Sequence, residues 1–495
     1  MKYNYPDDNL ALHTDAYELS MMQTYWKQGI GKKRAIFEAF FRKMPFNNGY
    51  AIYAGLDHII HYLNNLHFST SDIDYLKTTG QFADDFLEYL RNFKFTGTMR
   101  SFEEGELVFN NEPLLQIDAP LIEGQLIETA ILNILNYQIT VATKASRIKT
   151  VVGNQPVMEF GSRRAQEFDA ALWGTRAAYI GGFDSTSNVR AGKLFGIPIS
   201  GTHAHALVQA YRSDYKAFKA YAQTHRDCTF LVDTFDTLKS GVPNAIKVAK
   251  EMGDQINFQA VRIDSGDMAY LSKKVRKMLD DAGFTKTKII ASNGLDEQTI
   301  QNLKMQGAQI DVWGVGTKLI TAYDQPTLGA VYKLVAFADE QGKLVNTIKV
   351  SNNIGKISTP GKKQVWRIND RIDCKNEGDY VALDHEEPQK EPVLKMFNPN
   401  YPLQRKNVWD FIARPMLKTI WQDGKFVYDE PSLEEIRQRR QKSLDDFWNE
   451  YTRNLNPEIY PVDLSPQCYD NKQKILTEVH HYVDSFNNKN LTRDN

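Results

Sequence analysis

The sequence contains little cysteine, no excess of basic residues and no long apolar run. Its three cysteines, Cys228, Cys374 and Cys468, lie far apart and show no metal-type spacing. Such a sparse, odd count favours a reducing compartment over a disulfide framework. No stretch of about 20 uninterrupted apolar residues is present, so we expect no membrane span. Residues 1–20 include acidic side chains where a signal peptide needs an apolar run, and we therefore expect a cytoplasmic protein.

The charges of the chain balance almost completely. Lysine and arginine number 60 against 61 aspartates and glutamates, which gives a formal net charge of -1. A nucleic-acid-binding protein usually carries a basic excess, so we expect no nucleic-acid partner. A polyanionic ligand would instead need a local cluster of cationic groups and backbone N–H donors. With 495 residues, 42% of them hydrophobic, the chain is long enough for two or three packed lobes.

Short apolar runs alternate with amphipathic helical stretches through the middle of the chain. The runs end in small or polar residues and occupy 156–164, 177–188, 196–205, 229–237, 258–267, 288–296 and 310–317. Strand–helix units that repeat every roughly 20–35 residues predict a parallel α/β barrel or an open doubly wound sheet. We favour the barrel because the glycines are spread over several strand ends. A dinucleotide-binding sheet collects them in one turn after its first strand.

The two ends of the chain have a different pattern. The N-terminal part contains two strand-like runs and two helical stretches, and strand-like segments resume after the middle region. We expect a mixed α/β domain over 1–140, completed by about 335–400. The α/β barrel is expected over 141–334, and a C-terminal helical extension over 401–495.

Two glycine-containing segments, SNGLD at 292–296 and GVGT at 314–317, follow the last two strand-like runs. Glycine lets the backbone approach a phosphate closely, and the N-terminus of a following helix points N–H groups at it. Barrels commonly bind phosphate after their last two strands, which matches this placement. Either segment alone could be an ordinary strand–helix turn, with Asp296 capping the helix. The two together favour a phosphate site.

Charged side chains collect at two other strand ends. Arg262, Asp264 and Asp267 belong to the segment RIDSGD, and Asp233 lies in VDTFDT one strand earlier. Carboxylates at such positions can bind ribose hydroxyls or hold a magnesium ion that bridges to phosphates. An arginine there can pair with a carboxylate or a phosphate. A purely structural arginine–aspartate pair is the alternative interpretation.

The segments FGSRRA and GTHAHA add cationic and imidazole groups. The tandem Arg163 and Arg164 either form a solvated surface pair or supply the local cations that a near-neutral chain needs for a polyanion. His203 and His205 follow a strand-like run, where an imidazole can act as a nucleophile or general base. The two histidines alone are weak evidence for a metal, since no acidic or cysteine ligands have matching spacing.

Taken together, these segments resemble nicotinate phosphoribosyltransferases. The resemblance runs from about residue 12 to about residue 465, in TDAYELSMM, FEAFFRKMPFNNGYAIYAG, EFGSRRA, GGFDSTSN, ISGTHAHA, VDTFDT, RIDSGD, SNGL, GVGTKL, STPGKK and NPEIYPVDLS. It implies the longer bacterial type, with an irregular parallel α/β barrel packed on a mixed α/β domain formed by both chain ends and a C-terminal helical extension. It also implies a homodimer with the active site at the subunit interface.

The resemblance implies roles for individual residues. Those that match substrate contacts are Tyr17, Thr202 and Arg262 for nicotinate, and Arg163, Asn293, Gly294, Gly316 and Thr317 for 5-phosphoribosyl 1-pyrophosphate. The phosphorylated histidine falls on His205. Asp264 and Asp233 match catalytic carboxylates, and Asp264 with Asp267 are expected to hold magnesium. The family often has serine after the phosphorylated histidine, whereas this chain has Ala206, so a hydroxyl contact there is lost or replaced.

The implied reaction is the ATP-dependent formation of nicotinate mononucleotide and pyrophosphate from nicotinate and 5-phosphoribosyl 1-pyrophosphate, the first step of NAD salvage from nicotinate. Mg²⁺ and the co-substrate ATP are the implied cofactors. A nicotinamide phosphoribosyltransferase on the same fold is one alternative, but similar enzymes that take the amide carry an aspartate where this chain has His203. A catalytically silent metabolite-binding homologue is another, but degenerate motifs would be expected of it.

Overall fold

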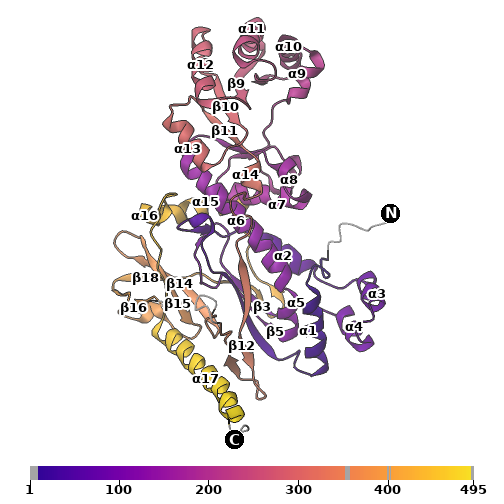
Figure 1. Cartoon of the computed structure of the whole chain (residues 1–495), viewed down its shortest axis with the longest axis vertical. Helices are drawn as coiled ribbons and strands as arrows, with labels where there is room; N and C mark the ends of the chain where they lie inside the picture. Colours follow the sequence, from indigo (N-terminus) through magenta and orange to yellow (C-terminus); the bar gives the residue numbers. More distant parts are fainter. Residues whose placement is uncertain (1–8, 352–356, 399–400, 402, 492–495) are drawn as a thin grey trace. The chain divides into compact units, whose positions relative to one another are not determined.

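The computed structural model describes residues 9–351, 357–398, 401 and 403–491. The chain divides into two compact units (Figure 1). Unit 1 consists of Met1–Ile139 and Thr327–Asn495, and unit 2 consists of Thr140–Pro326. Unit 2 therefore occupies nearly the stretch in which the sequence predicts a barrel, and unit 1 contains both ends of the chain.

Unit 2 is built on a six-stranded sheet whose strands pair in parallel, in the order β7-β6-β11-β10-β9-β8. The strands are β6 Val157–Glu159, β7 Ser185–Thr186, β8 Asp227–Leu231, β9 Asn257–Ile263, β10 Lys288–Ser292 and β11 Val312–Val315. The sheet forms half of a barrel, and the predicted parallel α/β class is confirmed. Because β6 pairs with β11, the segments that follow these two strands leave the sheet side by side.

Helices alternate with these strands because the connecting segments carry apolar residues every three or four positions. In α12, Met268–Asp281, the buried residues are Ala269, Ser272, Val275 and Leu279. Two of them join apolar residues of β8, β9 and β10 in one buried cluster. The other helices of unit 2 include α7 Glu167–Ile180, α8 Val189–Phe195, α9 His205–Tyr211, α10 Asp214–Thr224, α11 Val242–Met252, α13 Glu297–Met305 and α14 Thr317–Ile320.

Unit 1 contains an antiparallel sheet to which both chain ends contribute, in the order β13-β12-β1-β5-β3-β19-β20. Its strands are β1 Arg34–Phe41, β3 Thr98–Ser101, β5 Leu115–Pro120, β12 Ala330–Ala338, β13 Leu344–Asn346, β19 Lys418–Gln422 and β20 Lys425–Phe426. The long helix α6, Glu128–Val152, begins in unit 1 and ends in unit 2. The mixed α/β domain expected from both chain ends agrees with this arrangement.

A second sheet of unit 1 has the strand order β17-β16-β21-β15-β14-β18. Its strands are β14 Lys363–Asp370, β15 Asn376–Leu383, β16 Leu394–Phe397, β17 Arg405–Val408, β18 Phe411–Pro415 and β21 Val462–Leu464. A helical extension is expected over 401–495, but β17 to β21 lie in this segment as well as the helices. These strands are short and take their place by pairing with distant partners, so their local pattern carries little strand signal.

Unit 1 also contains helices, and the last described element of the chain is a helix. They include α1 Ala16–Lys27, α2 Leu56–Asn65, α3 Thr70–Thr78, α4 Asp84–Arg91, α5 Leu121–Leu126, α15 Leu433–Asp445 and α16 Asn449–Thr452. The last helix, α17, spans Pro466–Leu491 and is drawn in yellow in Figure 1. Among the described residues, no helix combines the length and the apolar character needed to span a membrane.

Candidate active site

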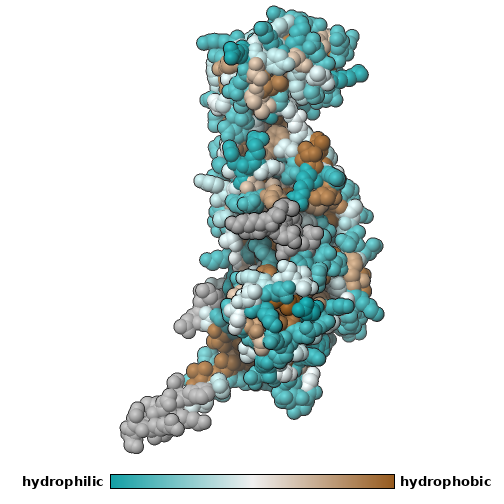
Figure 2. Space-filling view, turned by 90° about the vertical axis from the view of Figure 1, so that its right-hand side faces the viewer, coloured by the Kyte–Doolittle hydropathy of each residue, from teal (hydrophilic) through white to brown (hydrophobic). Residues whose placement is uncertain are grey.

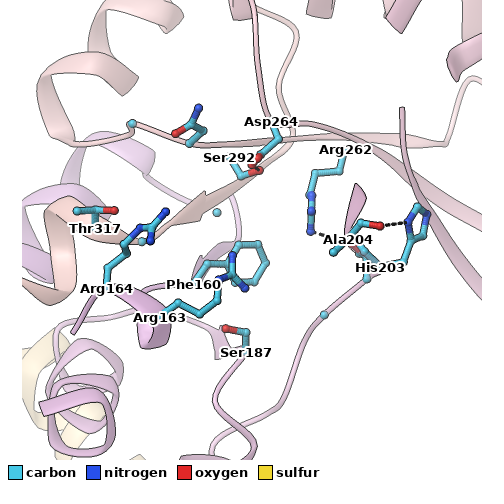
Figure 3. Close-up of a pocket in the computed structure, with 16 residues that line it drawn as sticks. Phe160, Arg163, Arg164, Ser187, His203, Ala204, Arg262, Asp264, Ser292 and Thr317 are labelled. Carbon is cyan, nitrogen blue, oxygen red and sulfur yellow. Dashed lines mark hydrogen bonds between the residues drawn. The ribbon is translucent and has the colours of Figure 1, made fainter. Parts of the chain in front are cut away.

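A pocket of about 310 Å³ lies at the carboxyl ends of the parallel strands in unit 2 (Figure 3). It brings together eight of the twelve residues that are expected to contact substrates, metal or the reacting groups: Arg163, Thr202, Arg262, Asp264, Asn293, Gly294, Gly316 and Thr317. Tyr17, His205, Asp233 and Asp267 are not among the lining residues. In Figure 3, Arg163, Arg164 and Thr317 lie on one side of the opening and Arg262 lies on the other. The pocket therefore has cationic groups on two sides, as a ligand with more than one anionic group requires.

Arg262, near the end of β9, is the most deeply embedded cation of this pocket. Its Nη1 donates a hydrogen bond of 2.8 Å to Oγ1 of Thr202. Its Nε is buried and has no hydrogen-bond partner within the described part of the chain. Burial lowers the pKa of the guanidinium, and the charges of Asp264 and Asp233 oppose that shift. A buried donor without a partner is costly, so this guanidinium is prepared to bind an acceptor group of a ligand.

Asp264 and Asp233 form the acidic side of the site. The Ser292 hydroxyl donates to Oδ1 of Asp264. The backbone N–H of Asp264 donates to Oδ2 of Asp233 at 3.1 Å, so two neighbouring strand ends are tied together. Oδ1 of Asp233 is buried and makes no hydrogen bond in the described residues. Asp267 is exposed and serves as the N-cap of α12, because its Oδ1 accepts from the backbone N–H of Tyr270 at 2.9 Å.

The two histidines of GTHAHA have different surroundings. His205 is the first residue of α9, its Nδ1 lies 3.0 Å from the Thr234 hydroxyl, and its Nε2 lies 3.9 Å from Oδ2 of Asp264. His203 is buried, and its Nε2 accepts from the backbone N–H of Leu231 at 3.2 Å. Burial lowers the pKa of His203 to about 4, so its ring is neutral and serves packing. His205, which is 37% exposed, is the histidine available for chemistry.

The two glycine turns line the pocket where β10 and β11 end. Asn293 and Gly294 both have positive φ, 80° and 64°, a conformation that glycine adopts without strain. A Cβ atom on Gly316 would lie 3.1 Å from the carbonyl oxygen of Phe160, so this turn runs close to the segment after β6. The expected helix cap is confirmed, because Asp296 accepts from the backbone N–H of Thr299 at 2.7 Å.

Glu159, which has no role expected from its sequence pattern, supports the segment that carries Arg163 and Arg164. It ends β6, is 1% exposed, and its Oε1 accepts from the backbone N–H of Gly161. Its Oε2 accepts from the hydroxyls of Thr175 at 3.0 Å and Thr186 at 2.6 Å. Burial raises the pKa of Glu159, and these three donors oppose the shift. The carboxylate thus joins α7 and β7 to the turn that carries Arg163.

We expect the substitution Glu159→Met to lower the free energy of unfolding of unit 2 by about 1–3 kcal/mol, because it leaves the buried N–H of Gly161 without an acceptor. Glu159→Gln should lower the free energy of unfolding by less. Its amide oxygen can still accept from Gly161, and the hydroxyls of Thr175 and Thr186 can turn to accept from its amide N–H groups. Chemical denaturation of both variants tests this. A methionine variant as stable as the parent protein would contradict the supporting role.

Phe160, Ser187 and Ser292 also line the pocket, and no role is expected of them from the sequence. Phe160 follows β6 directly and brings an aromatic ring to a pocket that is otherwise polar. Within the described residues, neither Arg163 nor Arg164 forms an ion pair, so their charges are available to a ligand. No described group of three or more histidine, cysteine, aspartate or glutamate side chains is arranged to hold a metal.

Tyr17, the remaining predicted nicotinate contact, belongs to unit 1. It lies on α1 and is 50% exposed. Burial raises the pKa of the neighbouring Glu18 to about 7, while the amide of Gln125 hydrogen-bonds one of its carboxylate oxygens. Tyr17 is therefore a surface aromatic residue beside a buried carboxyl group.

Comparison with known proteins identifies the family. The nicotinate phosphoribosyltransferase (NAPRTase) N-terminal domain matches residues 12–136, the nicotinate phosphoribosyltransferase (NAPRTase) family matches 156–378, and the nicotinate phosphoribosyltransferase C-terminal domain matches 362–472. Nicotinate phosphoribosyltransferase of Bacillus subtilis (strain 168) is 58% identical over 479 residues, which are 97% of this chain and 98% of the relative. The chain belongs to the nicotinate phosphoribosyltransferase family. It is therefore an enzyme, and the resemblance of its motifs to this family is confirmed.

Solved structures agree with this nicotinate phosphoribosyltransferase assignment. The crystal structure of human nicotinic acid phosphoribosyltransferase matches with a TM-score of 0.83 and 29% identity, covering 93% of this chain and 99% of that one. Nicotinate-nucleotide pyrophosphorylase from Pyrococcus furiosus shares the fold, with a TM-score of 0.69 and 24% identity over 90% of this chain and 98% of that one.

Proposed function

We propose that the chain transfers the phosphoribosyl group of 5-phosphoribosyl 1-pyrophosphate to nicotinate, and that ATP hydrolysis is coupled to the transfer. The observation that carries this proposal is that one pocket contains two kinds of site. Arg262, whose buried Nε has no partner in the described residues, lies on one side, and the two glycine turns with Arg163 and Arg164 lie on the other. A carboxylate on a flat ring suits a guanidinium. Phosphates suit glycine turns and unpaired cations. The names of the family relatives support the same acceptor.

The proposed reaction depends on positioning and charge. The pyridine nitrogen of nicotinate is already a nucleophile, and it attacks C1 of the ribose while the bond from C1 to pyrophosphate breaks. C1 develops positive charge in this step, and preorganised carboxylates stabilise it. Asp264 and Asp233, tied together at 3.1 Å, are suited to bind the ribose hydroxyls. Arg163 and Arg164 are suited to neutralise the departing pyrophosphate.

Magnesium fits the acidic side of the pocket. Oδ1 of Asp233 is a buried carboxylate oxygen without a partner in the described residues, and Asp264 lines the pocket beside it. Oxygen ligands of this kind are those that magnesium prefers. When bound, the ion would neutralise charge on the pyrophosphate. We therefore propose Asp264 and Asp233 as its holders, while the expected part of Asp267 stays a prediction.

The proposed entry point of ATP is His205. Transfer of the γ-phosphoryl group of ATP to a ring nitrogen would release ADP, and later attack by water would release inorganic phosphate and restore the imidazole. Thr234 occupies Nδ1, which leaves Nε2 on the side of Asp264. A phosphoryl group there adds negative charge and acceptor oxygens next to the pocket. Both can reorganise the contacts of magnesium and substrate.

We expect His205→Ala to abolish the stimulation of turnover by ATP and to leave slow, ATP-independent synthesis. The pocket-lining residues remain in place in this variant, so the transfer itself continues. Initial rates with and without ATP provide the measurement. His225→Ala is the matched control, because His225 is an exposed histidine of the same unit and should keep full stimulation. Full ATP coupling in the His205 variant would exclude this role.

We also propose a homodimer with the active site at the subunit interface. Figure 2 shows apolar areas on the molecular surface. In unit 2 the exposed large apolar residues include Phe168, Val189, Leu194, Ile199, Tyr211 and Phe235. Such side chains favour a protein partner. A second subunit would allow the exposed Tyr17 to stack on nicotinate. Sedimentation analysis with and without substrate measures whether the protein is a dimer.

The proposed function is tested by a coupled assay that follows nicotinate mononucleotide and ADP. Purified protein should form both products from nicotinate, the phosphoribosyl donor, magnesium and ATP. Nicotinamide, supplied in place of nicotinate, should be a poor substrate. Preferential use of nicotinamide would favour the amide-specific alternative, and ligand binding without product would favour a silent homologue.

A further inference from the structure

An ion pair joins the two glycine turns of the pocket. Asp296 ends the turn after β10 as the N-cap of α13, and Lys318 follows Thr317 in the first turn of α14, directly after the glycine turn that follows β11. Nζ of Lys318 lies 2.5 Å from Oδ2 of Asp296. The pair therefore connects two segments that are separated in sequence but line the same end of one pocket.

Both oxygens of Asp296 have structural partners. Oδ1 accepts from the backbone N–H of Thr299 and caps α13, and Oδ2 accepts from Lys318. The side chains are 15% and 32% exposed, respectively. Burial would raise the pKa of Asp296, but the hydrogen bonds from Lys318 and Thr299 lower it below its usual value. Asp296 is thus a charged link between a helix cap and the neighbouring turn.

We propose that Asp296 and Lys318 are a positioning pair that fixes the spacing of the two glycine turns for the 5′-phosphate of the phosphoribosyl donor. This inference rests on the proposed function. The backbone of Asn293–Gly294 and that of Gly316–Thr317 each line the pocket, and a phosphate that contacts both needs them at a constant distance. The chain between the two turns runs through α13 and β11, so the ion pair adds a direct non-covalent connection between the segments that follow them.

A direct role of Lys318 as phosphate ligand makes the opposite prediction for its partner. Lys318 is a cation beside a phosphate-type turn, but its charge is already neutralised by Asp296 at 2.5 Å. If Lys318 bound phosphate itself, removal of the Asp296 charge would free it and strengthen donor binding. If the pair positions the turns, removal of either charge weakens donor binding.

The test compares initial rates of the wild-type protein, Asp296→Asn and Lys318→Met over a range of donor and nicotinate concentrations. Asparagine is as good a helix cap as aspartate, so α13 stays capped and only the ion pair is lost. Each substitution should raise the KM for the donor by about 5–10-fold, which corresponds to the weakening of about one hydrogen bond to the 5′-phosphate. The KM for nicotinate, kcat and inhibition by pyrophosphate should stay within about twofold of wild type, because they do not depend on the 5′-phosphate contact.

The pair Lys149–Asp184 provides the matched control. Nζ of Lys149 lies 3.1 Å from Oδ2 of Asp184, and the two side chains are 18% and 34% exposed. Asp184 also accepts from the backbone N–H of Val157 at the start of β6, so this pair lies away from both glycine turns. Lys149→Met should leave the donor KM unchanged. An unchanged or lowered donor KM in Asp296→Asn, or an equal rise for donor and nicotinate, would overturn the positioning pair. Absence of turnover in the wild-type protein would instead overturn the proposed function and the inference with it.

Discussion

Replacing Arg367 with methionine is expected to lower the free energy of unfolding of unit 1 by about 3–5 kcal/mol, the cost of removing one partner of a buried ion pair. Arg367 lies on β14 and is fully buried. Its Nη2 and Nε donate to the two oxygens of Asp379 at 2.7 and 2.9 Å, and its Nη1 lies 3.3 Å from Oε2 of Glu106. Methionine fills much of the same space but leaves these carboxylates without their buried cation.

The loss of unfolding free energy in this variant should depend on pH. Burial disfavours the charged form of Glu106, but the contacts of Arg414 and the charge of Arg367 hold its pKa below the usual value, so the loss of Arg367 should raise that pKa in the folded variant. The folded variant then binds more protons than the folded wild-type protein as the pH falls, so the difference in unfolding free energy between the two shrinks. Glu112 shows the same physics, because burial and the charge of Asp379 hold its pKa well above the ordinary value. The difference from wild type should therefore be smaller at low pH than at neutral pH.

Arg371→Met is the control for this experiment. Arg371 pairs with Asp410 at 2.8 Å in the same unit, but the two side chains are 58% and 67% exposed. An exposed pair contributes about 0–1 kcal/mol, so this variant should unfold almost like wild type. Guanidinium denaturation followed by circular dichroism measures both variants. An Arg367 variant that loses no more than the Arg371 variant would show that the buried pair adds nothing to stability.

The sequence was sufficient to predict the parallel class of unit 2 and the gathering of its strand-end residues. Parallel strands have their carboxyl ends at one edge of the sheet, so Arg163, Arg262, Asp264 and Thr317 had to come near one another once the strands were recognised. The glycine turns carried a further local signal, because Gly294 requires positive φ. The pocket that contains these residues follows from topology and turn chemistry together.

Other features depend on contacts that the sequence does not reveal. The apolar run at 177–188 predicts a strand, but its first residues end α7, and only Ser185–Thr186 forms β7. A short apolar run has no periodicity that separates a buried helix end from a strand. Glu159 gave no signal either, because its function comes from Thr175 and Thr186, which are distant in sequence. The strands β17, β18 and β21 likewise form through their partners in the second sheet of unit 1, and β19 takes its place by pairing with β3 in the first sheet.

Arg262→Ala is expected to raise the KM for nicotinate by roughly 10–150-fold, which corresponds to the loss of about 1.5–3 kcal/mol for a hydrogen bond to a charged group. The side chain is half-buried, is held by Thr202 and has a buried Nε without a partner in the described part of the chain, so little entropy is lost when it binds a carboxylate. Its removal also leaves Asp264 and Asp233 without the cation that faces them. The carboxylate of nicotinate would then meet a negative pocket. Steady-state kinetics with varied nicotinate measures this change.

Nicotinamide serves as the control substrate, because it lacks the negative charge that Arg262 is proposed to bind. The variant should lose affinity for nicotinate and change little toward nicotinamide, so the preference between the two should narrow. Thr202→Val should also raise the KM for nicotinate, but by less, since it releases one end of the guanidinium without removing its charge. Because the interaction is present in the ground state and the transition state alike, kcat should change less than KM. An unchanged KM for nicotinate in Arg262→Ala would show that the carboxylate binds elsewhere.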